Sequence, residues 1–340
     1  MAGSESPDNT YVIADELQYA PIDVLGDQRV DMGRNSPAVL LCHASRSLGK
    51  PCPHVNRIVF IIHGALRNSN TYADHAWRAV QLSQVTASTL VVAPQFLADV
   101  DASPQRPLPE SALYWDVEGW KGGSPAKGPA PVSSFAAMDL LLRCVTRSTW
   151  PDIAPTDSPS EMINKRQDRT IIIAGNSAGG QFVNRYAAVG IEPRNLANCA
   201  LKVRFVISNP SSYLYFSAER PVAVAAGAEV NLWRFGFDAP VPYVTETPAE
   251  YLKQYLSREV TLVLGEEDRN PSGILLGISP PQMAQGPNRF ERGINYDRHI
   301  QEMAATTGMA PSHRLITLPG VGHDAGDVLA AEPTRNVLFT

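Results

Sequence analysis

The amino-acid sequence predicts an α/β fold with a mostly parallel eight-stranded sheet and helices on both faces. Short β-branched runs alternate with helix-like segments from one end of the 340 residues to the other, which is the pattern of parallel sheets. One such run, Thr170–Ala174, passes through the sequence GNSAG at 175–179 directly into a segment with helical periodicity. The first two expected strands have no helix between them, so we expect them to form an antiparallel edge.

The expected strands are short runs rich in valine, isoleucine, leucine and aromatic residues. They are Tyr11–Tyr19, Ala38–His43, Arg57–Ile62, Thr89–Ala93, Thr170–Ala174, Val203–Ser208, Val260–Leu264 and Arg314–Leu318. The expected helices have apolar residues at three- and four-residue spacing. They are Tyr72–Gln84, Ser134–Arg147, Ser177–Val189, Pro248–Ser257, Ile294–Thr306 and Asp324–Ala331.

Three segments are too long for simple connections, and we expect them to be insertions in a single domain spanning 1–340. They cover about 95–133, 210–256 and 270–293, and the first two are rich in aromatic residues. Long loops at the carboxyl ends of parallel strands build substrate sites in such folds, so these segments are expected to form a cap and pocket walls. The candidate substrate contacts are Arg67, Trp115, Trp120, Lys121, Arg289 and Arg292. The alternative is that the aromatic residues pack under the loops and the charged residues form surface ion pairs.

The composition is that of an ordinary globular protein and argues against several kinds of partner. The net charge of −5 gives no electrostatic footprint for nucleic acid or an anionic membrane. No apolar run is long enough for a membrane span, and the first residues lack a signal-peptide pattern, so we expect a soluble protein, either cytoplasmic or secreted after removal of a signal. Cys42 and Cys52 are candidates for a disulfide, Cys144 is expected to be a buried thiol, and no cysteine or histidine spacing indicates a metal site. No cofactor is expected, and the oligomeric state stays open.

The turn at 175–179 matches a G-x-S-x-G nucleophile elbow. This turn holds a serine at the tip of a strained strand-to-helix connection, with its hydroxyl pointing away from the sheet. The glycines on either side let strand and helix approach closely because they have no Cβ. Ser177 is therefore the candidate nucleophile.

A serine hydroxyl needs a histidine base, and a carboxylate must orient that histidine. Where the nucleophile lies in such an elbow, the order along the chain is serine, acid, histidine. His299, His313 and His323 follow Ser177, but the first lies within a helix and the second opens a strand. His323 follows the last strand in the glycine-rich loop PGVGHD, so it is the candidate base.

The acid is expected in the loop after Val260–Leu264, which reads Gly265-Glu266-Glu267-Asp268. Asp268 is the candidate because its position brings a short side chain toward the histidine. Glu267 is the alternative. Asp324 is next to His323 in sequence and is expected to point away from it.

The oxyanion of a tetrahedral intermediate needs two backbone N–H donors. One is expected from Ala178, the residue after the nucleophile, at a helix N-terminus. The other is expected from the loop after Arg57–Ile62, which begins His63-Gly64-Ala65-Leu66, with Ala65 as the candidate and Leu66 as the alternative. His63 precedes the serine, so it is expected to support this loop by hydrogen bonding.

These four strand-end motifs in order resemble those of the α/β-hydrolase superfamily over essentially the whole chain. Local strings such as WKGG, SSF, GNSAGG and AQGPNRFERG also resemble a group of microbial hydrolases similar to polyester depolymerases and poly(aspartic acid) hydrolases. The resemblance implies a cofactor-free serine hydrolase acting on carboxylic esters or amides, either small molecules or polymers. The rivals are an acyltransferase with the same triad and a non-catalytic ligand-binding protein of the same fold. An anionic polymer would need Arg67, Lys121, Arg289 or Arg292 in the cleft.

Overall fold

A central eight-stranded sheet organises the computed structural model, which describes residues 17–33, 36–102, 107–153, 168–223, 229–273 and 275–340. The strand order is β1-β2-β4-β3-β7-β8-β9-β10. The bounds are β1 Gln28–Asp31, β2 Val39–Ala44, β3 Arg57–Ile62, β4 Thr89–Gln95, β7 Thr170–Asn176, β8 Lys202–Ser208, β9 Glu259–Gly265 and β10 His313–Leu318. β2 pairs antiparallel with both β1 and β4. The six strands β4, β3, β7, β8, β9 and β10 run parallel to one another.

The central strands are buried on both faces, which explains their continuous apolar sequences. Every residue of β4 and β7 is buried, as expected for parallel strands covered by helices on each side. β7 lies in the middle of the sheet between β3 and β8. Its carboxyl end, where Ser177 follows Asn176, therefore lies beside the ends of β3 and β8.

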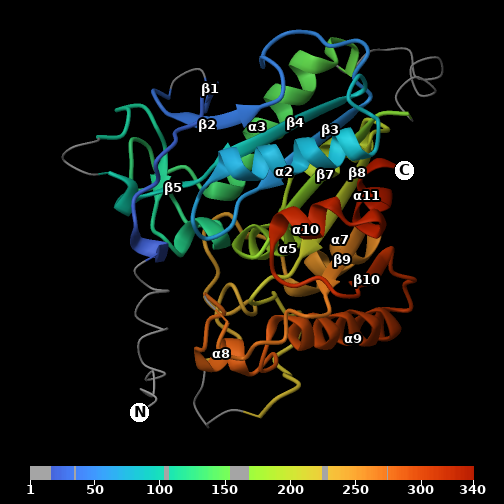
Figure 1. The fold of residues 1–340 in the computed structure, drawn as a ribbon. Helices are drawn as coiled ribbons and strands as arrows, with labels where there is room; N and C mark the ends of the chain where they lie inside the picture. Colours follow the sequence, from blue (N-terminus) through green and yellow to red (C-terminus); the bar gives the residue numbers. More distant parts are fainter. Residues whose placement is uncertain (1–16, 34–35, 103–106, 154–167, 224–228, 274) are drawn as a thin grey trace, which may run out of the picture.

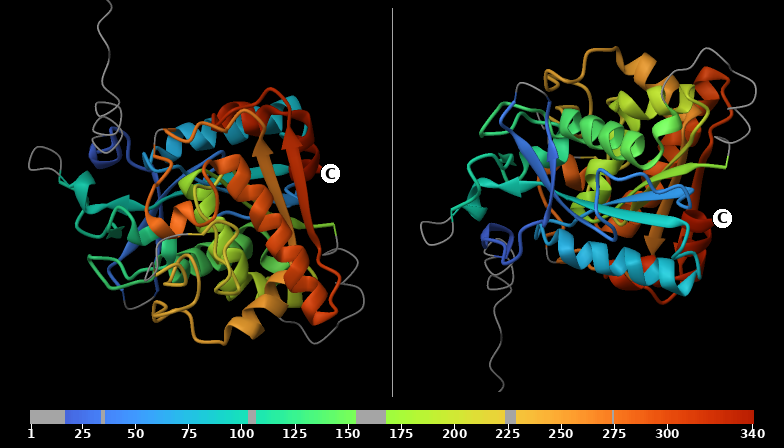
Figure 2. Two further views of the ribbon diagram at one scale, coloured as in Figure 1. Left: turned by 90° about the horizontal axis from the view of Figure 1, so that it is seen from below. Right: turned by 90° about the horizontal axis from the view of Figure 1, so that it is seen from above.

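Helices cover both faces of the sheet (Figures 1 and 2). One face packs against α2 (Ser69–Leu82), α10 (Ala325–Ala330) and α11 (Glu332–Phe339), in a cluster that includes Val59, Val91 and Ile172. The opposite face packs against α3 (Ser134–Thr149), α5 (Ala178–Val189), α7 (Pro248–Ser257) and α9 (Arg289–Thr307). The alternation of strand and helix thus buries both faces, as the sequence predicted. Among the described residues, no helix has both the length and the apolar character needed to cross a bilayer.

The expected elements from Ala38 onward are present, with shifts of a few residues at their ends. The first strand is placed wrongly: residues 11–16 of Tyr11–Tyr19 lie outside the described residues, and Leu17 to Tyr19 are helical. The antiparallel edge is instead made by β1 with β2. The short helix α6 (Glu192–Asn198) and the terminal helix α11 were not predicted, because neither is long enough to give a clear period.

The insertions contain little regular structure. The first holds β5 (Leu97–Ala98), η1 (Asp99–Asp101), β6 (Tyr114–Trp115) and η2 (Gly119–Gly122), and the third holds α8 (Pro280–Met283). A further single turn, η3 (Pro151–Ile153), follows α3. All four cysteines are free, and Cys144 is exposed, which corrects its expected burial. Cys42, buried within β2, and Cys52 are both free thiols, so the candidate disulfide between them is not formed.

Candidate active site

Ser177 occupies a strained turn between β7 and α5. Its φ of 58° and ψ of −120° lie in a region that residues other than glycine rarely adopt. A Cβ on Gly175 would lie 2.5 Å from the carbonyl carbon of Gly179, and one on Gly179 would lie 2.2 Å from the Ile62 carbonyl oxygen. The glycines are therefore required by the close approach of strand, helix and the end of β3, as the elbow motif predicted.

His323 and Asp268 are directly hydrogen-bonded. The distance from His323 Nδ1 to Asp268 Oδ2 is 2.7 Å. Since a carboxylate only accepts, Nδ1–H donates and Nε2 is left as the basic nitrogen. Asp268 is 5% exposed, and its other oxygen lies 3.4 Å from Nη1 of Arg289. Burial lowers the pKa of His323 below its ordinary value, against the opposing effect of Asp268.

Two asparagines hold the His323 loop at the end of the sheet. The Asn176 side chain donates to the His323 carbonyl at 3.1 Å. The Asn209 amide donates to the Gly322 carbonyl at 3.2 Å, while its oxygen accepts from Gly265 N–H at 2.9 Å. Asn209 thereby ties the loop that carries His323 to the strand end that precedes Asp268. Sequence reasoning missed this role, although an Asn-Pro pair directly after β8 was an available turn signal.

The remaining candidate histidines have structural partners. His63 is fully buried, with Nδ1–H donating to the Gly64 carbonyl and Nε2 accepting from Phe96 N–H at 2.9 Å. Burial lowers the pKa of His63 to about 3, so it stays neutral and holds the loop, as expected. His299 accepts from Phe216 N–H, and His313 contacts Tyr255 and Asp297. These contacts tie both histidines to other parts of the fold.

Neither neighbouring acid takes the position of Asp268. Asp324 caps α10, accepting from Asp327 N–H at 3.0 Å. Glu267 is exposed, and its backbone N–H donates to the Val321 carbonyl. Of the acids in the Gly265–Asp268 loop, Asp268 is the one bonded to His323.

The two expected oxyanion donors belong to different turns, one after β7 and one after β3. Ala178 is the first residue of α5, where N–H groups have no partner within the helix. Ala65 lies in the turn after β3, directly beyond the carbonyl that His63 holds. Ala65 and Ser177 line the same cavity.

This cavity has a volume of about 420 Å³ and contains both Ser177 and His323. Its wall is formed by residues 63–68 after β3, the candidate oxyanion loop, by α2, by the loop that carries His323 and by one residue of the third insertion. The lining residues are Gly64, Ala65, Leu66, Asn68, Thr71, Tyr72, His75, Asn176, Ser177, Leu275, His323, Asp324 and Ala325. Asp324 is thus an acidic group in the cavity, and no lysine or arginine among the described residues lines it.

The six residues expected to contact the substrate are all buried, and none of them lines this cavity. The structure therefore corrects that expectation. Arg67 forms a buried ion pair with Asp101, and Lys121 is paired with Glu118. Trp115 and Trp120 pack with Phe96 at ring-centroid distances of 5.4 and 5.6 Å.

The two arginines of the third insertion also have internal partners. Arg289 contacts the candidate triad acid Asp268, and the Arg292 guanidinium donates to backbone carbonyls of Ser211, Leu276, Gly277 and Gly286. Sequence spacing could not reveal that these cations serve the fold.

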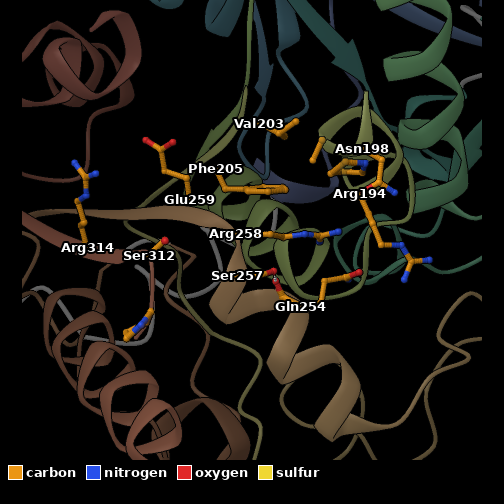
Figure 3. Close-up of a pocket in the computed structure, with 13 residues that line it drawn as sticks. Arg194, Asn198, Val203, Phe205, Gln254, Ser257, Arg258, Glu259, Ser312 and Arg314 are labelled. Carbon is orange, nitrogen blue, oxygen red and sulfur yellow. Dashed lines mark hydrogen bonds between the residues drawn. The ribbon is translucent and has the colours of Figure 1, made fainter. Parts of the chain in front are cut away.

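A larger cavity, of about 790 Å³, is shown in Figure 3. It lies at the amino ends of the parallel strands, whereas Ser177 lies at their carboxyl ends. It is lined by residues at the amino ends of β8, β9 and β10. Arg194 and Arg314 lie at its two ends, with Arg258 between them (Figure 3). Arg258 donates to the carbonyls of Tyr186, Ala187 and Gly190 and so closes the C-terminal end of α5. Within the described part of the chain, this cavity has no histidine in its lining and shares no residue with the Ser177 cavity.

Comparisons with solved structures agree with this architecture. Poly(aspartic acid) hydrolase-1 from Sphingomonas sp. KT-1 matches with a TM-score of 0.61 at 20% identity, covering 94% of this chain and 100% of that one. LpqC, a poly(3-hydroxybutyrate) depolymerase from Bordetella parapertussis, matches with a TM-score of 0.60 at 22% identity, covering 94% and 91%. No family model and no curated protein matches the sequence. At these identities the likeness concerns the fold alone: the chain has the α/β-hydrolase fold of these two proteins.

Proposed function

We propose that the protein is a serine hydrolase that cleaves carboxylic esters through an acyl-enzyme on Ser177. The observation that carries this proposal is the 2.7 Å bond from His323 to the buried Asp268 carboxylate, in a cavity that also contains Ser177 at a strained elbow. The two similar hydrolases of the same fold support the reaction class.

In the proposed mechanism, His323 Nε2 takes the Ser177 proton as the hydroxyl oxygen attacks the substrate carbonyl. Asp268 holds the tautomer and stabilises the imidazolium that forms. The N–H groups of Ala65 and Ala178 donate to the oxyanion of the tetrahedral intermediate. His323 then returns the proton to the leaving alcohol, and water cleaves the acyl-enzyme by the same steps.

The charges of the cavity favour an uncharged substrate over an anionic one. The cationic candidates Arg67, Lys121, Arg289 and Arg292 are buried outside it, and Asp324 would repel a carboxylate. Apolar walls from Leu66, Leu275 and Ala325 suit the carbon chain of an ester. An uncharged ester is therefore the proposed substrate class.

Hydrolysis of p-nitrophenyl butyrate by Ser177→Ala tests the proposal. We expect turnover to fall to the background rate with an unchanged circular dichroism spectrum. Ser257→Ala, which changes a serine of the larger cavity, is the matched control and should hydrolyse at the wild-type rate. Undiminished turnover in Ser177→Ala would contradict the proposal. Faster transfer to an added alcohol than to water would indicate an acyltransferase.

A further inference from the structure

A second cavity adjoins the Ser177 cavity on the side of the oxyanion loop. Its volume is about 330 Å³, and it shares Leu66, Asn68 and Thr71 with the Ser177 cavity. The remaining wall comes from the N-terminal segment and α2, through Leu17, Ala20, Pro21, Ile22, Asp23, Val24 and Asn70. The two cavities therefore lie next to each other, with Leu66, Asn68 and Thr71 in their common wall.

The second cavity is open to solvent and has exposed aliphatic side chains beside polar ones. Leu17, Val24 and Leu66 are 44%, 43% and 41% exposed, and these three side chains gather in one hollow. Large aliphatic side chains exposed together in a concave site indicate a ligand that covers them. Asp23 is the ionisable group of this lining, and no lysine or arginine among the described residues contributes to it.

Buried polar groups fix the wall of the second cavity to the oxyanion loop. The Arg67 guanidinium donates to the carbonyls of Gln18, Ala20 and Ala65 at 2.7, 2.7 and 2.9 Å. Its buried partner Asp101 accepts from Ile22 N–H at 3.1 Å. One ion pair thus holds together the segment that lines the second cavity and the loop that carries the candidate oxyanion donor Ala65.

The position of the common wall indicates which part of a substrate enters the second cavity. The leaving alcohol must lie beside His323, because His323 returns the proton to it. The residues that the two cavities share belong to the oxyanion loop and α2, and they do not include His323, Asp324 or Ala325. The second cavity therefore continues the acyl side of the site.

On these grounds, and resting on the proposed esterase function, we propose that the second cavity binds the distal part of a long, uncharged acyl chain. A chain bound there covers Leu17, Val24 and Leu66 while its ester carbonyl lies at Ser177. The uncharged polar side chains of Asn68, Asn70 and Thr71 also line the second cavity. The site thus selects long acyl esters over short ones.

The test compares kcat/KM for p-nitrophenyl octanoate and acetate in the wild type and in Leu17→Asp and Val24→Asp. We expect the wild type to prefer octanoate, because methylenes that enter an apolar site strengthen binding to the transition state. Each variant should lower the octanoate-to-acetate ratio at least about tenfold, because the introduced carboxylate would lose its hydration against a bound alkyl chain. Leu82→Asp is the matched control: Leu82 is 48% exposed and lines neither cavity, so the ratio should not change.

A second pair of substrates, octyl acetate and ethyl acetate, tests the acyl assignment. The ratio for this pair should be the same in the wild type and in both variants. A fall in this ratio, or wild-type turnover of acetate without a preference for octanoate, would overturn the acyl-chain site and leave the esterase function standing. Absence of turnover with every ester, together with an unreactive Ser177, would overturn the proposed function and the acyl-chain site with it.

Discussion

The cavity at the carboxyl edge of the sheet and the larger one at the amino edge differ in chemistry more than in size. The carboxyl-edge cavity, of about 420 Å³, contains Ser177 and His323, which a buried carboxylate orients. The amino-edge cavity, of about 790 Å³, has more space and three arginines but no histidine base for its serines (Figure 3). In an open α/β sheet the loops beyond the carboxyl ends of the strands converge, and ligand sites are built there. The topology of the sheet, rather than the volume of a cavity, therefore identifies the candidate active site.

Removing the candidate base from the carboxyl-edge cavity should cause the largest loss of hydrolytic activity. We expect His323→Ala to lower kcat for p-nitrophenyl butyrate by about 10⁴-fold or more, and the double variant with Ser177→Ala to be no slower than Ser177→Ala alone, because triad members act as a unit. His75→Ala is the control, since His75 lines the same cavity without a bond to Asp268. Steady-state kinetics of the four variants measures this. An equal loss in His75→Ala would contradict the assignment of His323.

Replacing the candidate acid should have the next largest effect. Asp268→Asn should lower kcat about 10³- to 10⁴-fold, because the amide no longer fixes the Nδ1–H tautomer of His323. Glu267→Gln is the matched control at the exposed neighbouring acid and should keep the wild-type rate. A reversal, with Glu267→Gln inactive and Asp268→Asn active, would show that the loop presents the other acid.

The acid limb of the pH profile should sharpen the assignment further. His323 must be neutral to accept a proton, so kcat/KM falls as the pH drops through its pKa. Burial lowers that pKa below the ordinary value of 6.5, so we expect the midpoint of the acid limb below pH 6.5. Asp268→Asn removes a hydrogen bond and a negative charge that raise this pKa, so the midpoint of the remaining activity should move to still lower pH. A wild-type midpoint above pH 6.5 would contradict the buried environment of His323.

Changing the amino-edge cavity should have the smallest effect. Arg194→Gln and Arg314→Gln, tested separately and together, should leave kcat/KM for the butyrate ester within about twofold, because exposed substitutions away from the site rarely alter the free energy by more than about 0.5 kcal/mol. A loss of tenfold or more would show that the larger cavity takes part in the reaction.

The sheet and helices, and the turn geometry at the candidate nucleophile, were predictable from sequence because they depend on local patterns. Buried parallel strands are continuous apolar runs, and the elbow at Ser177 needs glycines on both sides. His323 and Asp268 followed from chain order, and the structure places them 2.7 Å apart.

The substrate contacts were not predictable because burial depends on how distant segments meet. Arg67 lies in the oxyanion loop, yet its partners are Asp101 and the carbonyls of Gln18 and Ala20. Asn209 was missed for the same reason, since its bonds to Gly265 and Gly322 join loops that are far apart in the chain. The helix at Leu17–Tyr19 was mistaken for the end of a strand, because a short apolar run fits either element.

The most direct test of the central claim is covalent labelling of the folded protein by a fluorophosphonate, with the modified residue located by peptide mass spectrometry. We expect stoichiometric labelling of Ser177, which is lost in His323→Ala and in heat-denatured wild type. Folded wild-type protein that stays unlabelled, or that carries the label on Ser257 or Ser312 of the amino-edge cavity, would contradict it.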